Sequence, residues 1–129
     1  MKRYAIVSIL ILLAATSAFA GSTFQNSCSQ IMFVFNASGQ PVVQATCNTS
    51  AGTPHATSLV ITGISNQNGA LKSTGGASTF QQSCGNIQIQ VVNSSTVNLT
   101  GLCRASDGSS MSASIGLNIG NNNGNLQQQ

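Results

Sequence analysis

The sequence predicts a mainly β protein built from two tandem repeats, and three observations carry this prediction. The motif STFQNSC at residues 22–28 returns as STFQQSC at 78–84, and NQNGAL at 66–71 returns as NNNGNL at 121–126. Apolar and polar residues alternate with a period of two, which is typical of strands. Turn-forming Gly, Asn and Ser separate short segments, and no long helical pattern interrupts them.

The first 20 residues have the pattern of a secretory signal peptide. Lys2 and Arg3 precede an apolar stretch at 6–15, and 18–20 (AFA) forms a small-x-small cleavage site. A membrane anchor is the alternative, but the apolar run is short for a bilayer. We therefore expect cleavage after residue 20 and a secreted protein, extracellular or periplasmic, with one domain at 21–129.

The charges of that domain exclude two classes of partner. The formal charge of +3 includes Lys2 and Arg3, so Lys72, Arg104 and Asp107 leave a net charge of about +1. Binding to nucleic acid or to an anionic membrane needs clustered cations. We expect no nucleic-acid partner and no membrane insertion.

Four cysteines in an exported chain predict two disulfides, for which three pairings exist. The duplication favours one bridge inside each repeat, Cys28–Cys47 and Cys84–Cys103. A zinc site is not expected, because no C-x-x-C motif is present and the chain has a single His.

The repeats, 22–77 and 78–129, each predict a hairpin followed by a further strand. In the clearest strand, Ile87, Ile89 and Val91 share one face; Ile31, Phe33 and Phe35 are in phase with them. The predicted strands are 31–35, 42–47, 58–62, 87–91, 97–103 and 114–118. The predicted turns are 36–39, 50–54, 93–95 and 106–109. Each disulfide would then join the entrance of a hairpin to its exit.

Shorter signals complete the chain. Asn68-Gly69 and Asn123-Gly124 are tight-turn sequences, after which Leu71 and Leu126 return to the core. Segments 24–28 and 80–84 each allow one short helical turn. We expect a flexible link at 73–78 and disorder only at 127–129.

Catalytic chemistry has little support. The domain has one carboxylate side chain, Asp107, and one imidazole, His55, so hydrolysis by two carboxylates is excluded. No nucleophile-elbow motif supports a Ser-His-Asp triad, and Gly75-Gly76 precedes no predicted helix. We interpret His55 as a solvated turn residue and Asp107 as a turn former, and we expect no enzyme activity.

A surface rich in amides and hydroxyls both donates and accepts hydrogen bonds, which suits sugars. The domain has neither Trp nor Tyr, so sugar binding would depend on hydrogen bonds in shallow pockets.

The Phe-x-x-Ser-Cys opening, the second Cys across a hairpin and the Asn-x-Asn-Gly-x-Leu close, duplicated in order, resemble the cyanovirin-N homology domain. The resemblance covers nearly the whole of 21–129. It implies a pseudo-symmetric β fold in which the repeats exchange strands, as a monomer or a strand-swapped dimer. It also implies a lectin for mannose-rich oligosaccharides or glycoproteins, with a pocket at each end and no metal or cofactor.

The resemblance maps two carbohydrate pockets onto this sequence. The first comprises Thr23, Asn26, Ser27, Asn48, Thr49 and Ser50, completed by Asn121, Asn122 and Asn123. The second comprises Thr79, Gln82, Ser83, Arg104, Ala105 and Ser106, completed by Ser65, Asn66 and Asn68. Capping and turn formation are the alternative roles for these residues.

Members of the family often have acidic residues after the second cysteine and in the turn before Gly. This sequence has Asn48, Arg104, Asn68 and Asn123 at those positions. Neutral amides accept weaker hydrogen bonds than carboxylates. We expect the pocket with Asn48 to bind neutral sugars more tightly than the pocket with Arg104, because a guanidinium offers no acceptor. The alternative function is a secreted structural or adhesive surface protein that self-assembles.

Overall fold

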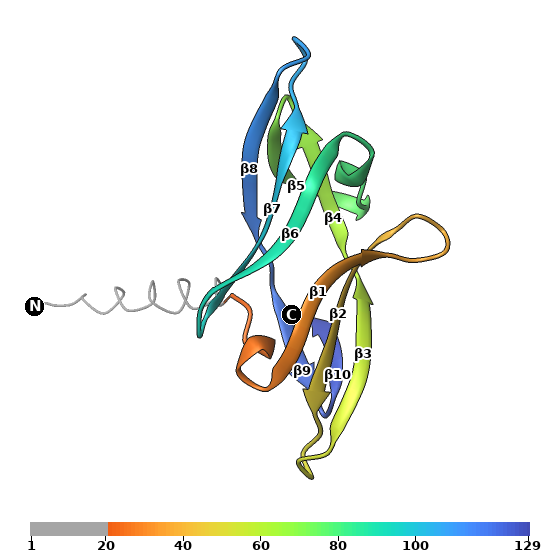
Figure 1. Ribbon diagram of the computed structural model, residues 1–129, viewed down its shortest axis with the longest axis vertical. Helices are drawn as coiled ribbons and strands as arrows, with labels where there is room; N and C mark the ends of the chain where they lie inside the picture. The colour runs from red at the N-terminus through yellow and green to blue at the C-terminus, as the bar shows by residue number, and fades with distance from the viewer. Residues whose placement is uncertain (1–20) are drawn as a thin grey trace, which may run out of the picture.

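The computed structural model describes residues 21–129; the predicted signal peptide at 1–20 lies outside the described residues. The described chain forms ten strands and two 3₁₀ turns (Figure 1). The first repeat contains η1 (Phe24–Asn26), β1 (Cys28–Phe35), β2 (Pro41–Asn48), β3 (Pro54–Val60), β4 (Thr62–Gln67) and β5 (Ala70–Ala77). The second contains η2 (Phe80–Gln82), β6 (Cys84–Asn93), β7 (Thr96–Arg104), β8 (Ser110–Gly116), β9 (Ile119–Asn122) and β10 (Asn125–Gln128).

Each repeat contributes one antiparallel three-stranded sheet and one two-stranded hairpin. The sheets have the orders β1-β2-β3 and β6-β7-β8, and the hairpins are β4-β5 and β9-β10. Cys28 lies opposite Cys47 and Cys84 opposite Cys103 in the registers of the two sheets. Both predicted disulfides form at these positions, so each one joins the entrance of a hairpin to its exit.

The hairpin of one repeat lies against the sheet of the other, which confirms the expected strand exchange. β9 and β10 are next to β1–β3 at one end of the elongated molecule, and β4 and β5 are next to β6–β8 at the other (Figure 1). The main-chain N–H of Leu126 donates to Thr57 Oγ1 at 3.1 Å. Each end of the molecule is therefore built from both repeats.

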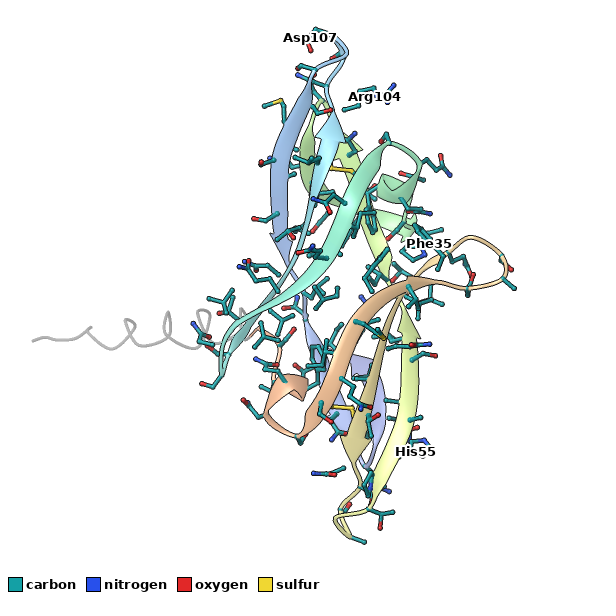
Figure 2. The ribbon with its side chains drawn as sticks, in the orientation of Figure 1. Phe35, His55, Arg104 and Asp107 are labelled. Atoms are coloured by element: carbon teal, nitrogen blue, oxygen red, sulfur yellow. A yellow bond between two sulfur atoms is a disulfide. The ribbon has the colours of Figure 1, made fainter. Side chains whose placement is uncertain are left out.

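The buried apolar side chains form one core, in which Phe24 and Phe80 are completely buried. Leu71 and Leu126 return to this core as predicted. The prediction of which side chains of β1 and β6 face the core is confirmed only in part. Ile87 and Ile89 pack against the core, whereas Val91 and its counterpart Phe35 are about half exposed. The physical reason is that β1 and β6 extend beyond the core at their hairpin ends (Figure 2).

Two predicted strands were wrong at their ends, because the chain crosses there from one half to the other. Segment 58–62 contains the end of β3 at Val60, the connecting residue Ile61 and the start of β4. The N–H of Ile61 donates to Pro41 O at 2.8 Å. In segment 114–118, β8 ends at Gly116, and the N–H of the connecting residue Leu117 donates to Val97 O at 2.9 Å.

The predicted flexible link at 73–78 is also wrong, since residues 73–77 belong to β5 and Ser78 is buried. Ser73 pairs with Ile64 and Ala77 with Thr62 on either side of a bulge. Pairing with β4 orders a segment whose small residues favour flexibility in isolation.

Three smaller expectations can be compared with the structure. The two short helical turns are confirmed as η1 and η2. His55 lies in β3 and not in a turn, although it is exposed as expected. Segment 127–129 is ordered, because Gln127 and Gln128 belong to β10 and the N–H of Gln129 donates to Asn118 O at 2.9 Å.

Residues 21–129 include no helix that is long and apolar enough to cross a membrane.

Candidate functional site

The candidate sites are built around the two Asn-Gly turns that close the exchanged hairpins. Asn68 and Asn123 have φ angles of 55° and 52°, and the following glycines have φ angles of 89° and 90°. Positive φ at both central residues is the requirement of a type I′ turn, for which Asn-Gly is the preferred sequence. The turns therefore form for a local reason, and their tips reach the sheet of the other repeat.

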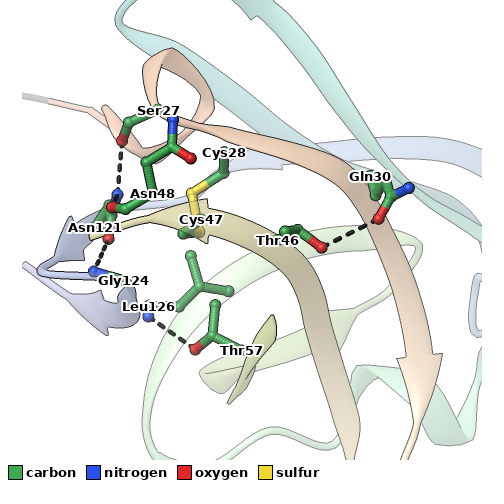
Figure 3. The surroundings of a disulfide bond; sticks show 10 residues. All are labelled: Ser27, Cys28, Gln30, Thr46, Cys47, Asn48, Thr57, Asn121, Gly124 and Leu126. Carbon is green, nitrogen blue, oxygen red and sulfur yellow. Dashed lines mark hydrogen bonds between the residues drawn. A yellow bond between two sulfur atoms is a disulfide. The ribbon is translucent and has the colours of Figure 1, made fainter. Parts of the chain in front are cut away.

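In the first site, Asn121 connects the β9-β10 turn to the first repeat (Figure 3). Its Nδ2 donates to Ser27 Oγ at 2.8 Å and to Asn48 O at 2.9 Å. Its Oδ1 accepts the N–H of Gly124 at 2.7 Å. One side chain thus stabilises its own turn and fixes that turn beside η1 and the end of β2.

The second site repeats this arrangement with Asn66. Nδ2 of Asn66 donates to Ser83 Oγ at 2.8 Å and to Arg104 O at 3.0 Å, and Oδ1 accepts the N–H of Gly69 at 2.8 Å. The two ends therefore have the same design despite different residues after the second cysteine.

The turn asparagines add a second connection. Asn123 Oδ1 accepts the N–H and the hydroxyl of Ser50 at 2.9 and 2.8 Å. Asn68 Oδ1 accepts the same two groups of Ser106 at 2.8 and 2.6 Å. Because an amide oxygen has two lone pairs, these bonds occupy its accepting capacity and leave the Nδ2 donors available.

An open groove of 250 Å³ adjoins the first site. Thr23, Asn121, Asn122 and Gln127 are among its lining residues. Asn122 Nδ2 donates to Gln127 Oε1 at 2.8 Å, which fixes both amides at its edge. Gln127 is not among the predicted site residues, because only the pairing of β9 with β10 brings it beside them.

Some predicted residues have local roles instead. Thr49 Oγ1 accepts the N–H of Thr53 at 3.2 Å and closes the β2-β3 turn. Asn26 Nδ2 donates to Ser94 O at 2.9 Å, so its amide connects η1 to the β6-β7 turn.

The remaining predicted residues lie in the second half of the molecule. The N–H of Thr79 donates to Ile64 O at 3.0 Å, and Ser65 Oγ accepts Gln67 Nε2 at 3.2 Å. Gln82 is exposed on η2, and Ala105, the counterpart of Thr49, is buried.

The two sites differ in charge. Arg104 and Asp107 lie toward one end of the molecule and His55 toward the other (Figure 2). The hydroxyl of Ser109 and then its N–H donate to Asp107 and lower the pKa of that carboxyl. The first site consists of neutral amides and hydroxyls, whereas exposed Arg104 adds a positive charge to the second. Within residues 21–129, no three His, Cys, Asp or Glu side chains are grouped as metal ligands.

Several solved structures match the fold of this chain. TbCVNH from T. borchii is 25% identical, with a TM-score of 0.64 over 83% of this chain and 99% of that one. Microvirin, solved in complex with mannobiose, is 26% identical, with a TM-score of 0.62 over 84% and 99%. A MoCVNH3 variant in complex with (N-GlcNAc)4 is 17% identical, with a TM-score of 0.63 over 85% and 99%, and shows the shared fold. A search of curated proteins gave no match.

The family model of the CVNH domain matches residues 24–127, which span both repeats, both disulfides and both Asn-Gly turns. Together with the exchanged hairpins, this match identifies the chain as a member of the CVNH domain family.

Proposed function

We propose that this protein is a secreted, non-catalytic lectin that binds mannose-type oligosaccharides in two pockets at opposite ends of the molecule. The observation that carries this proposal is the pair of equivalent side-chain amides, Asn121 and Asn66, whose hydrogen bonds hold donors and acceptors from both repeats together at each end. The mannobiose complex of microvirin, a structure with the same fold, supports the ligand class.

The contacts separate residues that position each pocket from residues that can bind a sugar. Asn121 and Asn66 use their amides inside the protein, so they position the pockets. The groups left for a sugar in the first pocket include the exposed side chains of Thr23, Asn48 and Asn122 and the Nδ2 donors of Asn123. Sugar hydroxyls need both donors and acceptors, and side-chain amides and hydroxyls supply both.

The second pocket is proposed to bind more weakly. Arg104 occupies the place of Asn48, and its five N–H donors come without an acceptor. The Thr49 hydroxyl already accepts a hydrogen bond within the β2-β3 turn, so the presence of Ala105 at the matching position of the second pocket takes little from sugar binding. The proposed difference therefore depends on Asn48 and Arg104, at roughly 1–2 kcal/mol.

Calorimetric titration with mannobiose and with a branched mannose oligosaccharide tests these proposals. We expect Asn48→Ala to weaken binding more than Arg104→Ala, and Ser38→Ala, at the exposed tip of the β1-β2 hairpin, to change nothing. Equal losses in the first two variants would refute the asymmetry. No binding by the unmodified protein to mannose-rich or other neutral glycans would refute the lectin proposal.

Self-assembly is a second candidate function because large apolar side chains are exposed. Phe35, Met32 and Val92 are at least half exposed, and Val91, Leu102 and Met111 nearly so. Sedimentation velocity distinguishes the two candidates. A lectin is expected to sediment as a monomer or a discrete dimer, whereas an assembling surface protein gives a series of larger species.

A further inference from the structure

A second kind of groove lies on the outer face of the first sheet, and two of its lining residues, His55 and Asn125, lie next to the Asn123-Gly124 turn of the first site. It has a volume of 480 Å³, within the range of small-molecule sites. Its lining residues include Gln30 and Met32 of β1, Gln44 and Thr46 of β2, His55 and Ser58 of β3, and Asn125 of β10. None of these residues belongs to the proposed end pockets.

The strand alternation explains why polar side chains line this face. Val43, Ala45 and Cys47 of β2 are buried in the core, so Gln44 and Thr46 point outward. Gln44 lies directly opposite Met32 on one side and Ser58 on the other. The three side chains therefore form a row across the sheet.

Gln30 has an unusual backbone conformation that directs its side chain to this groove. It lies in a bulge of β1 and has a φ of 53°. Thr46 donates its hydroxyl to Gln30 Oε1 at 3.1 Å (Figure 3). This bond orients the amide and leaves its Nε2 donors free, and bulges commonly re-aim side chains in this way.

The second sheet has an equivalent groove of 360 Å³. Gln88, Thr100 and Ser114 form the matching row, and Asn86 occupies the matching bulge with a φ of 52°. The feature thus occurs twice in the molecule, in surroundings of different sequence.

The chemistry of the first groove defines its ligand. Its lining residues include amides, hydroxyls and the imidazole of His55 but no Asp, Glu, Lys or Arg, and Met32 is 50% exposed. Neutral donors and acceptors beside one apolar side chain complement a sugar, whose hydroxyls need hydrogen bonds and whose C–H face needs apolar contact. We propose that this groove binds a linear, neutral oligosaccharide across the three strands, as a site distinct from the two end pockets.

Nuclear magnetic resonance titration of the full domain tests this inference. The probes are mannotetraose, cellotetraose and tetra-N-acetylchitotetraose, each at millimolar concentration. We expect at least one probe to shift the side-chain amide signals of Gln30 and Gln44. The signals of Asn48 and Asn122 report on the end pocket in the same spectra, so the two proposals are measured separately.

Matched variants assign the shifts to the groove. Gln44→Glu keeps the size of an exposed side chain but removes its donors, and we expect about a fivefold weaker affinity at the groove signals. Gln44→Ala is expected to act in the same direction. Gln90→Glu makes the same change on β6, outside both grooves, and is expected to leave the affinity unchanged.

The outcomes separate clearly. If no probe shifts the groove signals, the inference is overturned, even when the end-pocket signals move. An equal loss in Gln44→Glu and Gln90→Glu would also overturn it, because the effect would then be one of charge alone. Groove shifts with unmoved end-pocket signals would support this inference and refute the proposed end pockets.

Discussion

Replacing Asn121 by alanine is the most direct test of how the exchanged hairpin is held in place. The substitution removes two donated hydrogen bonds, to Ser27 Oγ and to Asn48 O, and one accepted from the N–H of Gly124. It leaves the backbone of β9 intact. The effect should therefore measure the connection between the repeats.

The magnitude follows from these three bonds. A neutral hydrogen bond contributes about 1 kcal/mol net, and a buried donor left without a partner costs about 1–3 kcal/mol. Gly124 is buried, so its N–H would become a buried donor without a partner. We expect Asn121→Ala to lower the free energy of unfolding by about 3–5 kcal/mol, which is a large share of the stability of a domain of this size.

Urea unfolding followed by circular dichroism measures this loss at unchanged protein concentration. Asn118→Ala, at an exposed position just before β9, is the control and is expected to change stability by less than about 0.5 kcal/mol. Asn66→Ala should cost somewhat less than Asn121→Ala, because its partner Ser83 is exposed. A loss below about 1 kcal/mol for Asn121→Ala would refute the reasoning, because its three bonds would then contribute nothing beyond solvation.

Three further predictions concern stability. Gly124→Ala should destabilise the fold by about 1–3 kcal/mol in thermal melts, because φ is +90° and an added Cβ would lie 2.9 Å from Thr49 Cγ2; an unchanged melting temperature would contradict this. Removing the Cys28–Cys47 bridge by double alanine substitution should cost about 2–5 kcal/mol in the same urea assay; a smaller loss would show that the sheet does not need the bridge. The folded-state pKa of Asp107 is lowered, so the ionised carboxylate stabilises the fold above the unfolded pKa of about 4, and this stabilisation is lost as pH falls through the folded-state pKa. Asp107→Asn should therefore reduce the acid sensitivity of the melting temperature. An identical pH profile in the variant would contradict the lowered pKa.

The candidate sites could be predicted only partly from the sequence. The resemblance to the cyanovirin-N homology domain implied that Asn48, Asn121 and Asn123 lie at the same end, and their hydrogen bonds confirm that proximity. The sequence could not show that Asn121 uses its donors within the protein, since this depends on where Ser27 lies. It also gave no signal for Gln127, whose place depends on pairing between β9 and β10.

By itself, the sequence determined the repeats, the two disulfides and the Asn-Gly turns. These features depend on local chemistry or on the duplication: a type I′ turn needs positive φ at two adjacent residues, and equivalent cysteines in the two repeats pair equivalently. Such constraints can be read without knowing the three-dimensional arrangement.

Only the tertiary structure decided where the strands end and which groups remain for a ligand. The strand predicted at 58–62 divides at Ile61 because the chain crosses there to the other half, and the link at 73–78 becomes part of β5 because β4 supplies hydrogen-bond partners. The free donors at each end and the row containing Gln44 likewise depend on contacts between distant segments. Long-range pairing supplies these contacts, and no local pattern of residues encodes them.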